Sequence, residues 1–101
     1  MTQFRLAPAA QRDLTDIWLY TADNWGVDQA DFYDQQIEDD LASVAAGTRI
    51  AQRIDDFWKI RSGHHLCIFD RLKDGSLWVI RILHERMDVN EQLGEWEHNI
   101  K

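Results

Sequence analysis

The sequence is poor in cysteine and proline, and it has no long hydrophobic run. Its single cysteine, Cys67, cannot form an intramolecular disulfide and belongs to no Cys or His cluster, which fits a reducing cytosol. One proline and five glycines in 101 residues exclude collagen-like and proline-rich disordered chains. No window reaches the roughly 18 apolar residues of a membrane span, and residues 1–5 show no signal-peptide pattern. We therefore expect a cytoplasmic protein that does not bind membranes.

Positive charge is also scarce. The chain has 18 acidic and 11 basic side chains, a formal net charge of −7. Such a chain is a poor candidate for direct nucleic-acid binding, which needs a positive field. The charge is uneven, however: residues 1–40 hold nine acids against two bases, whereas residues 49–86 hold eight bases against five acids. The first half is strongly acidic and the second half mildly basic.

Two amphipathic helices are predicted in the acidic half. The first follows Pro8, which suits the first turn of a helix, and the second ends before Gly47. Their apolar stripes step by three or four residues, through Ala10, Leu14, Ile17, Thr21 and Trp25, and through Ala30, Tyr33, Ile37, Leu41 and Val44. Gly26 separates them by so little chain that they must form an antiparallel hairpin. Trp18 and Trp25 flank the first stripe, so we expect both in the core.

The remaining segments have the composition of strands. These are residues 3–7, 57–61, 65–71 and 77–84, with an Asp74-Gly75 turn before the last. The order β-α-α-β-β-β predicts an α+β fold, a helical hairpin packed on a three- to four-stranded, mainly antiparallel sheet. Residues 1–88 form the predicted domain. Residues 89–101 form an acidic tail whose Trp96 is expected to dock on the domain.

Residues 77–84 are the most apolar run, which is typical of a strand inside a sheet. Strict alternation would place Trp78, Ile80, Ile82 and His84 on one face and Leu77, Val79, Arg81 and Leu83 on the other. Arg81 then lies among apolar neighbours, where an unpaired charge is costly. Two interpretations stay open: an internal ion pair with one of the acids, or a grip on a partner's carboxylate.

No sequence motif indicates a metal site, a cofactor or a nucleophile. The chain lacks HxH, HExxH and CxxC spacings, a glycine-rich phosphate loop and GxSxG. Cys67 lies in mid-strand and is interpreted as a small buried hydrophobe. His84, Glu85 and Arg86 could perform acid–base chemistry on a phosphodiester, but we favour a cluster that supports the end of the strand.

Basic and aromatic residues are interleaved in the strand half. Arg53, Lys59, Arg61, Arg71 and Arg81 could form a basic patch beside Phe57, Trp58 and Trp78. Such a patch can bind single-stranded nucleic acid, although a solvated, salt-bridged sheet face is the more frequent outcome.

The order of several short motifs resembles a known family. The N-terminal half is similar to the RelE/ParE superfamily of bacterial toxins in Phe4–Ala10, Asp13-Leu14, Ile17, Tyr20, Trp25-Gly26, Gln29-Ala30 and Tyr33. The segment Val79–Asp88 resembles the ParE signature. The resemblance covers about residues 3–88.

The resemblance implies the toxin of a type II toxin–antitoxin module. ParE-type toxins share the fold of RelE ribonucleases but block DNA gyrase, and a ParD-type antitoxin wraps and neutralises them. The ribonuclease branch often has a C-terminal tyrosine, and this chain has none after Tyr33. That departure favours the gyrase branch, for which no catalytic residue is carried over. A RelE-type, ribosome-dependent mRNA endoribonuclease and a decayed toxin that only binds antitoxin stay open. The candidates for antitoxin or target binding are Arg61, Trp58, Trp78, Arg81, His84 and Arg86.

Overall fold

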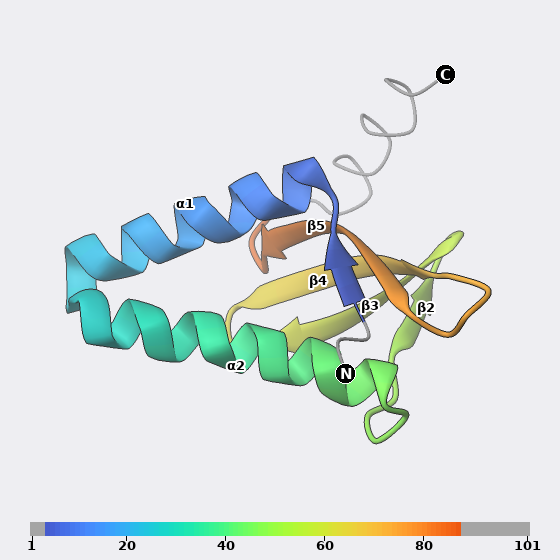
Figure 1. The fold of residues 1–101 in the computed structure, drawn as a ribbon. Helices are drawn as coiled ribbons and strands as arrows, with labels where there is room; N and C mark the ends of the chain where they lie inside the picture. The colour runs from blue at the N-terminus through green and yellow to red at the C-terminus, as the bar shows by residue number, and fades with distance from the viewer. Residues whose placement is uncertain (1–3, 88–101) are drawn as a thin grey trace.

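The fold is a two-layer α+β sandwich. A computed structural model describes residues 4–87. Its elements are, in order, β1 (Phe4–Leu6), α1 (Pro8–Trp25), α2 (Val27–Ala45), β2 (Gln52–Ile54), β3 (Phe57–Ser62), β4 (His65–Arg71) and β5 (Leu77–His84). Both helices lie across one face of the sheet as an antiparallel pair (Figure 1). The predicted fold class is confirmed, while the predicted tail and Trp96 fall outside the described residues.

The helical hairpin follows the predicted stripes closely. Pro8 opens α1, and Gly26 joins the helices with a φ of 98°, a conformation that favours glycine. The inner residues of α2 are buried, as predicted: Ala30, Ile37, Leu41 and Val44. The expectation that Trp25 is core is wrong, because its side chain is 66% exposed. Neither helix is long and apolar enough to span a membrane.

The sheet has one strand more than the three to four expected. Its order is β1-β5-β4-β3-β2, with β1 parallel to β5 and all other neighbours antiparallel. The additional strand is β2, which is too short to show alternation in sequence. It pairs with β3 across a turn at Asp55, whose φ of 51° is one that Asp tolerates better than most residues.

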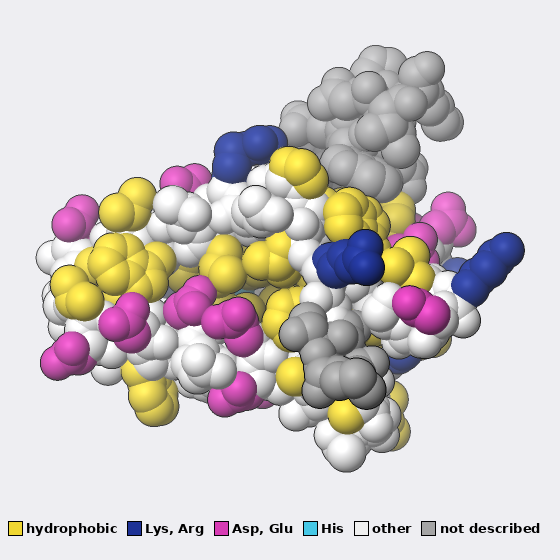
Figure 2. All heavy atoms as spheres, in the orientation of Figure 1, with side chains coloured by type: hydrophobic (Ala, Val, Ile, Leu, Met, Phe, Trp, Pro, Cys, Tyr) yellow, Lys and Arg dark blue, Asp and Glu magenta, His cyan; other side chains and the backbone are white. Residues whose placement is uncertain are grey.

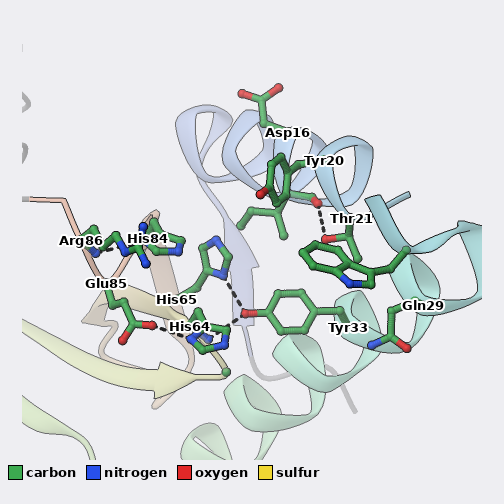
Figure 3. Close-up of a pocket in the computed structure, with 13 residues that line it drawn as sticks. Asp16, Tyr20, Thr21, Gln29, Tyr33, His64, His65, His84, Glu85 and Arg86 are labelled. Atoms are coloured by element: carbon green, nitrogen blue, oxygen red, sulfur yellow. Dashed lines mark hydrogen bonds and ion pairs between the residues drawn. The ribbon is translucent and has the colours of Figure 1, made fainter. Parts of the chain in front are cut away.

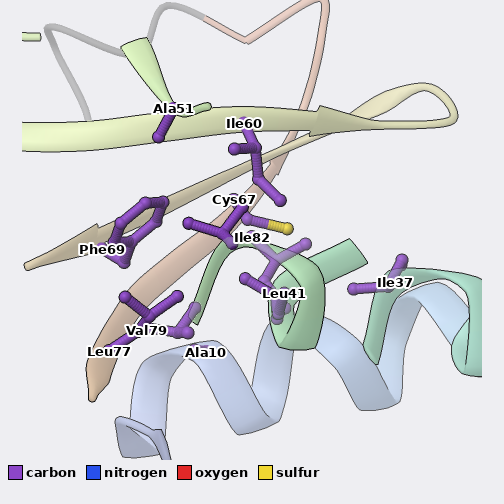
Figure 4. Close-up of a cluster of buried hydrophobic side chains, with 11 residues drawn as sticks. Ala10, Ile37, Leu41, Ala51, Ile60, Cys67, Phe69, Leu77, Val79 and Ile82 are labelled. Carbon is purple, nitrogen blue, oxygen red and sulfur yellow. The ribbon is translucent and has the colours of Figure 1, made fainter. Parts of the chain in front are cut away.

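Both faces of the sheet are apolar, which explains the unbroken hydrophobic run of β5. The helix-side core joins buried residues of both helices to the sheet, and Figure 4 shows this packing: Ala10, Ile37, Leu41, Ile60, Cys67, Phe69, Leu77, Val79 and Ile82. The outer-face core contains Phe57, Ile68, Ile80 and Leu83. Cys67 is fully buried, and burial raises the pKa of its thiol to about 12, so it packs as a neutral hydrophobe.

A β-bulge in β5 overturns the strict alternation expected for that strand. Ile68 pairs with Arg81 but Phe69 pairs with Val79, so Ile80 is the extra residue. Ile82 consequently joins the helix-side core and Leu83 the outer-face core, the reverse of their expected faces. The expectation was wrong because a bulge adds one residue and shifts every later side chain to the opposite face.

One carboxylate of α1 fixes the bulge. Asp13 accepts hydrogen bonds from Arg81 Nε at 2.7 Å, Arg81 Nη2 at 3.0 Å and the Ile82 backbone N–H at 2.9 Å. Both side chains are largely buried, with 22% of Arg81 and 15% of Asp13 exposed. Of the two interpretations of Arg81, the structure shows the internal ion pair. The pair joins the first helix to an inner strand across 68 residues of chain.

We predict that Asp13→Ala lowers the free energy of unfolding by about 2–3 kcal/mol, because it leaves the Arg81 charge and the Ile82 N–H without this acceptor. Asp16→Ala, one turn further along α1 at an exposed position, is the matched control and should cost less than about 0.5 kcal/mol. Urea unfolding followed by tryptophan fluorescence measures both. Equal stability of the two variants would contradict the assigned role of Asp13.

Candidate functional site

A pocket of about 1030 Å³ opens between the helical hairpin and one end of the sheet. Figure 3 shows its side chains converging from α1, α2, the β3–β4 turn and the end of β5. The lining residues are Asp16, Ile17, Tyr20, Thr21, Trp25, Gln29, Tyr33, Gly63, His64, His65, His84, Glu85 and Arg86. One wall is therefore aromatic and helical, and the other consists of imidazoles and charged groups.

The helical wall presents large apolar side chains to solvent. Tyr20 is 63% exposed, and its ring meets that of Trp25 edge-on at 6.0 Å. Figure 2 shows hydrophobic side chains gathered between the two helices, with acidic side chains around them. Exposed aromatic groups gathered on one surface are typical of a site where another protein binds.

Tyr33 joins the two walls. Its hydroxyl accepts a hydrogen bond from the His64 backbone N–H at 2.9 Å and shares another with His65 Nδ1 at 2.7 Å. Gly63 makes this position possible, since a Cβ there would lie 2.5 Å from the Tyr33 hydroxyl oxygen. Burial raises the pKa of Tyr33, so the phenol is neutral at pH 7. This contact fixes the β3–β4 turn against α2.

His65 is held in its neutral form. Burial lowers its pKa to about 4, and the neighbouring His84 and His64 act in the same direction. Its ring meets that of His84 edge-on at 5.2 Å and that of Tyr33 at 5.6 Å. At neutral pH this imidazole is a packing and hydrogen-bonding group without charge.

The outer rim of the pocket is a chain of polar contacts around Glu85 and His84. His64 Nδ1 lies 2.5 Å from Glu85 Oε2, and Arg61 Nη1 lies 3.1 Å from Glu85 Oε1. The contact with His64, followed by the charge of Arg61, lowers the pKa of Glu85. His84 Nδ1 accepts the Arg86 backbone N–H at 3.1 Å. These contacts lie at the end of β5, where the sequence favours a cluster that supports the strand.

The six candidates from the sequence fall in different places. His84 and Arg86 line the pocket, and Arg61 touches it through Glu85. Arg81 is bound by Asp13, and Arg81, Trp58 and Trp78 all lie outside the lining. Sequence reasoning missed Tyr33 and His65. In the sequence, Tyr33 stands out only as a stripe position and as part of the family resemblance. The signal for a site role is its polar hydroxyl, which needs a partner when it is partly buried.

No group of three or more metal-binding side chains comes together within residues 4–87. The three imidazoles are close to one another, but each is already engaged by a protein group: Tyr33, Glu85 or a backbone N–H. At least one nitrogen of each imidazole in the described part of the pocket is thus already in a protein contact.

Residues 4–89 match the family model described as the ParE toxin of the type II toxin–antitoxin system parDE. Toxin ParE1 of Mycobacterium tuberculosis (strain H37Rv) is 36% identical over 96 residues, covering 91% of this chain and 98% of that protein. Toxin ParE1 of Caulobacter vibrioides is 30% identical over 100 residues, covering 93% of this chain and all of that protein.

The fold is also found in a solved structure. A chain of the chromosomal ParDE system from P. aeruginosa superposes with a TM-score of 0.67, covering 83% of this chain and 96% of that one. Its sequence identity of 16% makes this a likeness of fold alone.

We predict that His65 makes stability depend on pH. Between its unfolded pKa of about 6.5 and its folded pKa of about 4, the unfolded chain binds a proton that the folded chain does not. The stabilisation is therefore complete above pH 6.5 and is lost as the pH falls towards 4. Because His65 is only partly buried, we expect the loss to be about 1–2 kcal/mol.

The measurement is urea unfolding of the wild type and His65→Gln at pH 7.5, 6.0, 5.0 and 4.5. The variant lacks the imidazole, so its stability should fall less steeply over this interval. His64→Gln, at a highly exposed position, is the matched control. Parallel curves for the wild type and His65→Gln would contradict the neutral, buried state of His65.

Proposed function

The chain belongs to the ParE toxin family and is the toxin of a type II toxin–antitoxin module, and we propose that it acts by inhibiting DNA gyrase and is neutralised by a ParD-type antitoxin. The observation that carries this proposal is the family match over residues 4–89, which spans both helices and all five strands. A gyrase target also places the toxin in the cytoplasm.

The geometry of the pocket supports binding rather than catalysis. Acid–base cleavage of RNA needs an imidazole or carboxylate that is available to the substrate and titrates near neutral pH. Here His65 is neutral and bound to Tyr33, His64 is bound to Glu85, and His84 Nδ1 accepts a backbone N–H. Each of these imidazoles therefore uses at least one nitrogen in a contact within the pocket, which supports binding over catalysis.

The antitoxin is best accommodated on the helical wall of the pocket. Neutralisation requires tight binding, and tight binding depends on a few large side chains that become buried in the complex. Tyr20 and Trp25 are exposed here, beside a cavity large enough for several side chains. Burying Trp25 alone would remove a large apolar area from water. A C-terminal antitoxin segment lying over the hairpin would cover this wall and the imidazoles below it.

We predict that the purified toxin inhibits supercoiling of relaxed plasmid by gyrase and that its antitoxin, added in equimolar amount, restores the activity. A gel assay of plasmid topology measures both. Unimpaired supercoiling at a large molar excess of folded toxin would disprove gyrase inhibition. Codon-phased mRNA cuts by primer extension after induction would instead support the ribonuclease alternative, and normal growth would support a decayed toxin.

We predict that Trp25→Ala weakens antitoxin binding at least tenfold, because about 1.4 kcal/mol or more of apolar burial is lost. Its thermal stability should stay within about 1 °C of the wild type, since most of the Trp25 side chain is exposed. Leu19→Ala is the matched control, because Leu19 is exposed on the same helix but lies outside the pocket lining. Isothermal titration calorimetry measures the affinity of each variant for the antitoxin. Equal affinity of the two variants would show that the antitoxin binds elsewhere.

A further inference from the structure

We propose that Arg53 and Arg71, stacked on Trp58, form a second binding surface that grips carboxylates of the toxin's protein target. We call these three residues the Arg–Trp–Arg cluster. The inference rests on the proposed function, in which the target is gyrase, and it deepens it by naming a contact. It also gives a role to the basic and aromatic residues of the strand half, which the pocket does not use.

The cluster is built by the register of three neighbouring strands. Trp58 on β3 is paired directly with Arg53 on β2, and with Phe69 on β4, two residues before Arg71. The Arg53 guanidinium carbon lies 5.1 Å from the centre of the Trp58 ring, and that of Arg71 lies 4.8 Å from it. Trp58 packs against the helix-side core. An anchored indole thus supports two exposed guanidiniums that reach it from the strands on either side.

The charges of this cluster are not neutralised by carboxylates of the described residues. Arg49, Arg61 and Arg81 each form an ion pair with an acid. Within residues 4–87, Arg53 and Arg71 form none, although the chain as a whole has seven more acids than bases. Stacking on an aromatic face orients a guanidinium but leaves its charge available. Arg53 Nε donates a hydrogen bond to the Asp55 carbonyl at 3.1 Å, which also orients this guanidinium, so its two terminal nitrogens are the donors that face a partner. Two like charges near one ring favour an anion that binds to both.

The surroundings select a carboxylate over a nucleic-acid backbone. The two turns that flank the cluster carry acids, Asp55 and Asp56 in one and Asp70 and Asp74 near the other. These acids would repel a continuous polyanion, whereas a single carboxylate can enter between them. The Trp58 ring already carries both guanidiniums, which leaves it poorly suited to stack a nucleobase. A carboxylate fits the paired donors of a guanidinium well.

The cluster is separate from the pocket. Trp58 lies near the start of β3, and the pocket begins after its end, at Gly63. Five residues of extended chain place the two roughly 16 Å apart. One surface can therefore serve the antitoxin and the other the target, and variants can separate the two functions.

The test compares gyrase inhibition and antitoxin binding for two double variants of the full chain. R53Q/R71Q removes the two guanidiniums of the cluster. R5Q/R12Q is the matched control, because it removes the same charge from exposed arginines on β1 and α1 that stack on neither Trp58 nor Phe69. We expect R53Q/R71Q to raise the toxin concentration for half-inhibition of supercoiling at least tenfold, and the control less than twofold. Antitoxin affinity should change less than twofold in both.

R53K/R71K covers the case in which the glutamine variant does not fold. It keeps the charges and loses the planar, two-pronged donors, so we expect at least a threefold loss of inhibition. Thermal unfolding of every variant confirms folding.

The other outcomes overturn the proposal. Unchanged inhibition of gyrase by R53Q/R71Q excludes the contact. An equal loss of inhibition in both double variants shows that inhibition depends on the overall charge of the toxin and not on the cluster. Loss of antitoxin affinity in R53Q/R71Q alone assigns the cluster to the antitoxin. If the wild-type toxin retards linear DNA in a gel and R53Q/R71Q does not, the cluster binds DNA instead of a protein carboxylate. A wild-type toxin that leaves gyrase unimpaired disproves gyrase inhibition itself, and this contact with it.

Discussion

The arrangement of the two layers depends on the contact between the Asp13 carboxylate of α1 and residues 81–82 of β5. β1 pairs with β5 only as far as Val79, so the Ile82 N–H lies beyond the end of β1. Asp13 comes from the helix that follows β1, and it binds this N–H together with the Arg81 guanidinium. A β-bulge without such an acceptor would leave a backbone donor unpaired at the junction of helix and sheet. A single side chain thus closes the sheet edge and fixes the position of α1.

The pocket is a consequence of that bulge. With strict alternation His84 would lie on the same face as Trp78 and Ile80, which belongs to the outer-face core. The extra residue instead brings His84 to the helix side, where its ring meets that of His65. His65 in turn is held by Tyr33, which crosses from α2 over Gly63. The chemistry of the pocket is therefore set by backbone register as much as by residue type.

This dependence explains how much the sequence could predict. The helical stripes and the three long strands were predictable because their periodicity reports burial along a regular backbone. The bulge and the three-residue strand β2 were not predictable. Both arise from pairing between two segments, and such pairing leaves no periodic pattern in the sequence of either segment. Trp25 was misassigned because the apolar period gives the face of a helix but not how far the neighbouring layer extends, and Trp25 is the last residue of α1. Tyr33 was placed on its stripe correctly, but its partner lies about 30 residues further along the chain.

The charge distribution of the chain is consistent with the two binding surfaces proposed for it. The acidic helical hairpin and the mildly basic strand half lie in different layers, and Figure 2 shows acidic side chains around the two helices. In the proposed antitoxin contact, apolar burial at Tyr20 and Trp25 supplies the affinity, since both side chains are exposed in the isolated chain. Charge supplies selectivity at the Arg–Trp–Arg cluster, where the guanidiniums are pre-positioned on an anchored ring and lose little freedom on binding. A negative net charge is therefore compatible with an anion-binding surface, because the acids that produce the charge belong mainly to the other layer.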